Sequence, residues 1–336
     1  MQKTEGYQRF YSKISSFQKI LDQAQKAEHP ALEFYQSSAR QVLFYLEALA
    51  RIYKKIYDKK QFKSFQNTFK ELEDQLGKID FYDAYWKEFS SIKDFPSNVL
   101  NVIKQHYFNE LHQLGEILTK ENWLKADGKL KGILENLDAV EWLPLVAETQ
   151  AIAKVMTGQI EKLETQYNSG KLNFDDIESG VHEFRRKIRW ISIGAHALDG
   201  LIQLKKDEYD VFLKGYLTKE VLTNKYNKLP EMKKGIPPIF LSQSAFYALS
   251  WLINESGILK DNGLKVVCVE EALKEIGDLK EDEIQKTANS LTNSEEISLK
   301  DIKERMKFIS DHFVFTDRVF DILIKDLKLA IEASED

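Results

Sequence analysis

The sequence predicts an all-α fold built from long antiparallel helices. Six prolines and 15 glycines in 336 residues are few. Both residue types interrupt helices, so their scarcity favours long helices over many short strands. A hydrophobic content of 43% with 12% aromatic residues is enough to build a large buried core. Apolar residues recur at spacings of three and four in nearly every window, which is the period of an amphipathic helix.

The first half of the chain is predicted to form four long helices. Each is defined by an apolar stripe and by the residues expected to end it, because glycine commonly closes a helix and proline disfavours helical backbone before it. The expected helices are residues 5–27, ending near His29-Pro30; 31–57; 62–76, ending at Gly77; and 96–119, opened by Pro96-Ser97. Gly128 and residues 135–138 are expected to be turns between shorter helices.

The second half is predicted to contain long helices separated by one clear loop. This loop is residues 229–238, which contain three prolines and Gly235. The segment 266–269 has the β-branched composition of a short strand. The expected helices are residues 144–167, closed by Asn168-Ser169-Gly170; 174–206; 239–254; and 298–333.

One apolar stripe occurs twice, once in each half. Every position of the first stripe matches an apolar position of the second at one constant offset. The two stripes are Leu32, Tyr35, Ala39, Val42, Leu46, Leu49 and Tyr53, and Val181, Phe184, Ile188, Ile191, Ala195, Leu198 and Ile202. The polar face moves in the same phase, so that Arg40 corresponds to Arg189. We therefore expect two pseudo-symmetric helical bundles, residues 1–155 and 156–336, fused into one elongated unit.

Charge and cysteine content narrow the class of protein. A net charge of −5 and a pI near 5.8 argue against general or sequence-specific binding of nucleic acid, which usually uses a basic domain. Cys268 is the one cysteine, so no disulfide within the chain is expected and a reducing compartment is favoured. The first residues lack an apolar signal segment, and no apolar run is long enough to span a bilayer. We expect a cytoplasmic protein without a membrane partner.

Positive charge in this chain is mostly lysine, yet three of the eight arginines lie within residues 185–189. A guanidinium group matches the geometry of phosphate and carboxylate oxygens better than an ammonium group does. On a helix, spacings of three, four and seven place side chains on one face. The side chains that share this face are His182, Arg185, Arg186, Arg189 and His196. Like charges so close repel each other, and a bound anion would offset that repulsion.

The segment Val181-His182-x-x-Arg185-x-x-x-Arg189, in a helix that is apolar on its other side, resembles the motif of the CHAD family (conserved histidine α-helical domain). The resemblance implies an all-α fold of two helical repeats around a basic central cavity that binds inorganic polyphosphate. It also implies that His182, Arg185 and Arg189 point into that cavity, with Arg40 as the equivalent residue of the first repeat.

The predicted function is non-catalytic binding of inorganic polyphosphate or a similar polyanion in a basic cleft between the two halves. Basic residues near the end of the first stripe are expected to extend the cleft. No zinc, nucleotide or dinucleotide motif is present, so we predict no catalytic residue, no metal and no cofactor. The predicted anion-binding residues are His182, Arg185, Arg186, Arg189, Arg40, Arg51, Lys54 and Lys55.

Other interpretations of the same residues remain open. In the first, the arginine cluster forms structural ion pairs, and the helices are a scaffold that binds a protein partner. In the second, Asp175 and Asp176 belong to an aspartate-rich magnesium motif for diphosphate chemistry, although acids in a first helical turn are also stabilised by the helix dipole. His196 lies among Gly194, Ala195 and Ala197, which favours packing against a neighbouring helix over a role as a ligand.

Overall fold

The computed structural model describes residues 4–292 and 299–332. Within them the chain forms thirteen α-helices and one sheet of two short parallel strands. The prediction of an all-α fold is therefore confirmed. Buried apolar side chains from both halves join one continuous core, as expected when each helix carries an apolar stripe.

Six helices form between residues 4 and 144. They are α1 (Glu5–Lys26), α2 (Pro30–Gln36), α3 (Ala39–Tyr53), α4 (Lys59–Ser90), α5 (Ser97–Lys120) and α6 (Lys129–Asp138). The helices predicted at 5–27 and 96–119 are confirmed. The single helix predicted at 31–57 is wrong, because it breaks after α2. There the Ser37 hydroxyl donates to the Phe34 carbonyl at 2.7 Å and accepts from the Ala39 amide at 3.0 Å, which replaces backbone hydrogen bonds.

Gly77 does not end a helix as predicted, since α4 continues past it to Ser90. A β-carbon at Gly77 would lie 2.8 Å from a guanidinium nitrogen of Arg40. This glycine therefore makes room for a close side chain. Residues 135–138 are also helical, as the end of α6, whereas Gly128 precedes α6 as expected.

The second half contains seven helices in its described residues. They are α7 (Leu145–Asn168), α8 (Glu183–Ala197), α9 (Lys219–Thr223), α10 (Gln243–Ile276), α11 (Glu281–Leu291), α12 (Leu299–Asp311) and α13 (Val319–Glu332). The helix predicted at 144–167 is confirmed by α7. Strand β1 (Ile202–Lys205) pairs in parallel with β2 (Ile239–Ser242), with Ile202 opposite Ile239.

The helix that carries the arginine cluster is shorter than the predicted 174–206. A π-helical turn, Ile177–His182, leads into α8. After α8 the backbone reverses through Asp199 and Gly200, whose φ angles are 55° and 91°, and it then enters β1. The last part of the predicted helix is therefore a strand.

Three further predictions in this half need correction. The helix predicted at 239–254 begins only after β2 and continues to Ile276. Residues 266–269 are helical because they lie inside α10, where helix packing overrides their strand propensity. The helix predicted at 298–333 is divided by the π-helical segment His312–Thr316 and by Arg318, whose φ is 50°. Its predicted end residues, 298 and 333, lie outside the described part of the chain.

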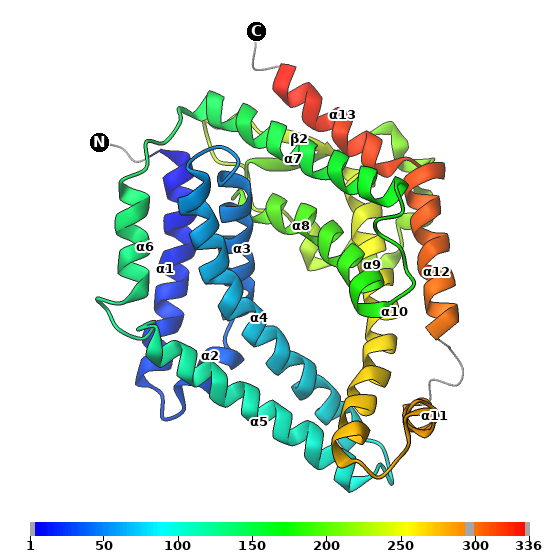
Figure 1. Cartoon of the computed structure of the whole chain (residues 1–336). Helices are drawn as coiled ribbons and strands as arrows, with labels where there is room; N and C mark the ends of the chain where they lie inside the picture. The colour runs from blue at the N-terminus through cyan, green and yellow to red at the C-terminus, as the bar shows by residue number, and fades with distance from the viewer. Residues whose placement is uncertain (1–3, 293–298, 333–336) are drawn as a thin grey trace.

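The long helices form a frame around α8 (Figure 1). Helix α3 packs against α1, α4 and α8, and α8 also packs against α7 and α10. The far end of α10 meets α5, which packs along α4. The helices α3, α4, α5, α10 and α8 therefore surround the centre of the molecule. No helix in the described residues is both long and apolar enough to cross a bilayer.

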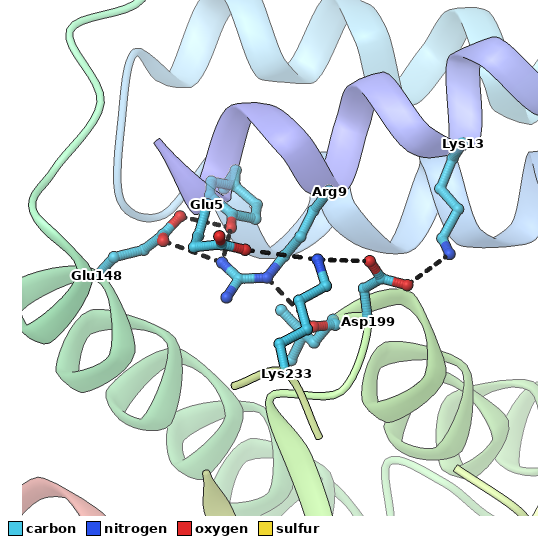
Figure 2. Close-up of polar contacts among 8 residues, drawn as sticks. Glu5, Arg9, Lys13, Glu148, Asp199 and Lys233 are labelled. Carbon is cyan, nitrogen blue, oxygen red and sulfur yellow. Dashed lines mark hydrogen bonds and ion pairs between the residues drawn. The ribbon is translucent and has the colours of Figure 1, made fainter. Parts of the chain in front are cut away.

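A buried ion pair joins the two halves at one side of this frame (Figure 2). Arg9 on α1 and Glu148 on α7 are each 1% exposed, with 2.9 Å between guanidinium and carboxylate. The Arg9 guanidinium also donates to the Tyr53 hydroxyl at 2.9 Å and to the Leu198 carbonyl at 3.1 Å. The Tyr53 hydroxyl donates to Glu148 at 2.6 Å. Four segments, α1, α3, α7 and the end of α8, are thus held by one guanidinium.

Partly exposed ion pairs extend this contact outwards (Figure 2). Asp199, in the turn after α8, pairs with Lys13 of α1 at 3.1 Å and with Lys233 at 2.8 Å. Lys233 also reaches Glu5 at 3.4 Å. Lys233 belongs to the proline-rich loop 229–238, which was predicted from the sequence and is confirmed. The loop is therefore fastened to α1 and to the end of α8.

Replacing Arg9 by methionine should destabilise the protein by about 3–5 kcal/mol, because Glu148 would stay buried without its cation. The free energy of unfolding in urea measures this loss. The double variant Arg9→Met with Glu148→Leu should recover most of it, since it removes both charges. A single variant that unfolds at the wild-type urea concentration would contradict the prediction.

Candidate anion-binding site

The centre of the frame holds a cavity of about 780 Å³, here called the central cavity. Its walls come from α3, α4, α5, α8 and α10, from the π-helical turn before α8, and from Lys303 of α12. Five of the eight predicted binding residues line it, namely Arg40, Arg51, His182, Arg186 and Arg189. The structure thus brings guanidinium groups of α3 and α8 to the same cavity.

The central cavity does not carry the expected excess of positive charge. Seven lysine and arginine side chains line it, and so do seven carboxylates, so its formal charges balance. Arg40 forms ion pairs with Glu73, at 3.0 Å, and with Asp80. Arg186 pairs with Glu183 at 2.6 Å. Most of the acidic partners come from α4, α5 and α10, which lie far from the arginine motif in sequence.

Arg189 is an exception among the arginines of the central cavity. Its guanidinium lies over the Phe44 ring, 5.0 Å from the centroid, and Arg40 lies 5.5 Å from the same ring. No carboxylate among the described residues forms an ion pair with Arg189. Burial, and then the charge of Arg40, lower the pKa of Arg189. This side chain is a largely buried cation held by an aromatic face.

Arg185 lies outside the central cavity, although the CHAD resemblance implies that it points inside. Its Nε donates to the Ile253 carbonyl of α10 at 3.2 Å. A β-carbon at Gly257 would lie 3.0 Å from that nitrogen, which is closer than an ordinary contact, so glycine at this position gives the guanidinium room against α10. Burial, and then the charge of Arg189, lower the pKa of Arg185 to about 10. Its contacts join α8 to α10.

His196 is packed inside the protein, as the small residues around it predict. Its side chain is 8% exposed, and its ring stacks on Tyr45 with 6.3 Å between centroids. Its Nδ1 lies 2.9 Å from the Ser192 carbonyl. Burial lowers the pKa of His196, which favours the neutral ring and a structural role.

A second cavity, of about 510 Å³, lies between α3, α7 and α8. We call it the lysine pocket. None of the described residues that line it is a carboxylate. Its basic lining residues are Arg51, Lys54, Lys55, Lys154, Lys162 and Lys187. Three of the predicted binding residues, Arg51 on α3 and Lys54 and Lys55 just after its end, therefore meet three lysines of α7 and α8 that sequence reasoning missed.

Few of these cations are neutralised by a neighbour. Arg51 pairs with Glu47 at 2.7 Å, and Lys187 pairs with Glu183 at 3.0 Å. In the described part of the chain, no carboxylate forms an ion pair with Lys55, Lys154 or Lys162. The lysine pocket thus concentrates unpaired positive charge in a protein whose net charge is negative.

Lys54 shows the effect of burial and of the neighbouring positive charges. Its ammonium group donates to the Gln66 amide oxygen of α4 at 2.6 Å and has no carboxylate ion pair among the described residues. Burial lowers the pKa of Lys54 to about 8, helped by the nearby charges of Arg51, Lys63 and Lys55, although Glu47 acts in the opposite direction. An anion in the pocket would stabilise the charged form of this lysine.

Arg51 and Trp190 line both cavities and stand between them. The Arg51 guanidinium lies 4.0 Å from the centroid of the Trp190 ring, a distance typical of a cation–π contact. The central cavity and the lysine pocket are thus neighbours, and the stacked pair of Arg51 and Trp190 lines both.

The sequence contains a weak signal for two of the missed lysines, Lys154 and Lys162. Lys154, Gly158 and Lys162 are spaced by four on α7, which places them on one helix face. Nothing local indicates that this face meets α3, because that contact depends on the tertiary fold.

Searches against models of protein families, curated proteins and solved structures find no match to this chain. The described residues also contain no cluster of three or more histidine, cysteine or carboxylate side chains able to hold a metal ion.

Replacing Gly158 by alanine should raise the free energy of unfolding by about 1 kcal/mol, because glycine is unfavourable inside a helix. A β-carbon at this position would meet no atom within 4 Å, so the added methyl group causes no clash. Urea denaturation measures the gain. Gly132→Ala, in α6 and equally open, is the matched control and should behave in the same way. A destabilised Gly158→Ala variant would contradict the prediction.

Proposed function

We propose that this protein binds inorganic polyphosphate or a similar phosphate-bearing polyanion in the lysine pocket, without catalysing a reaction. The observation that supports the proposal is the set of six basic residues that line this pocket without a carboxylate. Phosphate oxygens are well matched to such a set, because ammonium and guanidinium groups form short charge-assisted hydrogen bonds to them. Until an anion binds, most of these positive charges repel one another.

The lengths and packing order of the helices support a second part of the proposal, that two related halves form the molecule. Helices α1, α3 and α4 have 22, 15 and 32 residues, and α7, α8 and α10 have 24, 15 and 34. In both sets the short helix packs between the other two, and the short helices α3 and α8 pack against each other. This repeated order is what the resemblance to the CHAD family implies. On this proposal the junction between the halves would be residues 139–144, between α6 and α7, because residue 155, the boundary expected from the sequence, lies inside α7.

We assign a structural role to the part of the arginine cluster that lies away from the pocket. Arg40 and Arg186 are already paired with carboxylates, and Arg185 joins α8 to α10. Together with the buried pair of Arg9, these contacts position α8. This is the structural interpretation of the arginine cluster, and it applies to the side of α8 that faces the central cavity and α10. The lysine pocket lies on the side that faces α3 and α7.

Long-chain polyphosphate should bind the purified protein at low salt and bind more weakly as salt is added, because counterions compete with phosphate contacts. Calorimetric titration measures the affinity. Lys154→Gln together with Lys162→Gln should weaken binding about tenfold or more, since two charge-assisted contacts are lost. The matched control is Lys19→Gln with Lys26→Gln, two exposed lysines of α1 that carry the same charge change outside both cavities. No binding at low salt, or an equal loss in the control, would overturn the proposal.

Polyphosphate affinity should also fall between pH 7 and 9.5, by about fivefold for one lost surface charge contact. The direction follows from the pKa of Lys54, which is lowered to about 8, so that this lysine loses its proton as the pH rises through that value. Binding itself should raise the pKa of Lys54, which moves the fall to the upper part of the range. Lys54→Arg keeps the charge and should give a flatter profile in the same titration. Parallel profiles for the two proteins would show that Lys54 does not contribute.

A further inference from the structure

The walls of the lysine pocket are not uniformly polar. Behind the basic side chains lies an apolar surface, here called the pocket floor, made by Ile52 of α3, Val155 and Leu163 of α7, and Trp190 and Ile191 of α8. Val155 and Trp190 are only partly buried, so part of this surface is open to solvent. Lys55, Lys154 and Lys162 are exposed and lie toward the rim. The pocket therefore has a charged rim and an apolar interior.

Two glycines inside helices keep the pocket floor open. Gly158 lies in the middle of α7 and Gly194 in α8, and both line the pocket. A β-carbon at Gly158 would meet no atom within 4 Å, and one at Gly194 would make only an ordinary contact of 3.6 Å with Ile52. Neighbouring side chains therefore require neither glycine, although each weakens its helix. Larger residues at these positions would fill the space between rim and floor.

We infer that the preferred ligand of the lysine pocket is a phosphate ester with a compact apolar or aromatic group, which lies on the pocket floor while its phosphate binds the rim. This inference rests on the proposed function and narrows its ligand class. A bare phosphate chain uses only the charges and leaves the apolar surface in contact with water. An ester with a ring adds the burial of apolar area on both sides. A volume of about 510 Å³ suits a small molecule of this kind.

A series of phosphate monoesters with constant charge tests the inference. Methyl, phenyl and 1-naphthyl phosphate are dianions at pH 8 and differ in apolar area, so electrostatics alone predicts equal affinities. The pocket floor predicts a rise from methyl to 1-naphthyl phosphate on the order of tenfold or more. Tripolyphosphate, titrated beside them, reports on the rim alone. Calorimetry, or competition against long-chain polyphosphate, measures each dissociation constant.

A pair of matched variants locates the effect. Gly158→Leu should fill the space above the pocket floor, remove the preference for the naphthyl ester, and leave the affinity for tripolyphosphate within about threefold, since rim charges are kept. Gly132→Leu makes the same change in α6, where a β-carbon also meets no atom within 4 Å, and should bind like the wild type. Unfolding curves of both variants verify that they are folded.

The possible results separate the two proposals. Tripolyphosphate binding with equal affinities for the three esters would overturn the inference and leave the proposed function standing. A naphthyl preference that survives in Gly158→Leu would also overturn it, because the ring would then bind elsewhere. Failure of tripolyphosphate, polyphosphate and all esters to bind at low salt would remove both proposals.

Discussion

The buried contact between Arg9 and Glu148 is the constraint on which the rest of the structure depends. It connects α1 to α7, and through Tyr53 and Leu198 it reaches the ends of α3 and α8. The lysine pocket is built from α3, α7 and α8, which are the three other segments held by this guanidinium. If either the Arg9 guanidinium or the Glu148 carboxylate moved away, the other would remain unpaired in the core. The pair therefore fixes the distances between helices whose facing lysines would otherwise push them apart.

Counter-charge, more than the number of arginines, distinguishes the two cavities. The central cavity contains most of the arginine motif, yet carboxylates of α4, α5 and α10 balance it. The lysine pocket contains only one arginine, Arg51, but its lining has no carboxylate in the described residues. Arg51 stacks on Trp190 between them. The clustered arginines are held by a carboxylate, a backbone carbonyl and an aromatic ring, whereas an anion site needs a place that acidic side chains do not reach.

The sequence predicts the helices better than their interruptions, for identifiable reasons. Periodic apolar stripes gave α1, α5 and α7 nearly residue for residue, because the stripe is a property of each segment alone. The break at Ser37 and the reversal at Asp199 and Gly200 depend on side-chain hydrogen bonds and positive φ angles that no period reveals. In the lysine pocket, the lining residues Arg51, Lys54 and Lys55 are noticeable in the sequence, because basic residues are dense at the end of one predicted helix. Their partners on α7 were missed because only the tertiary fold brings α7 against α3.

Two local sources of instability coincide at the lysine pocket. Like charges from three helices face one another there, and Lys54 is crowded enough that its pKa falls to about 8. On the same surface α7 carries Gly158, which no neighbouring atom requires. A pocket shaped only by stability would place acids among the lysines and a larger residue at the glycine, since both changes are accessible by single substitutions. Local departures from stable design are expected where a surface is kept for a ligand. The coincidence of unpaired charge and unfilled space therefore favours this pocket over the better-paired central cavity as the site of the proposed anion.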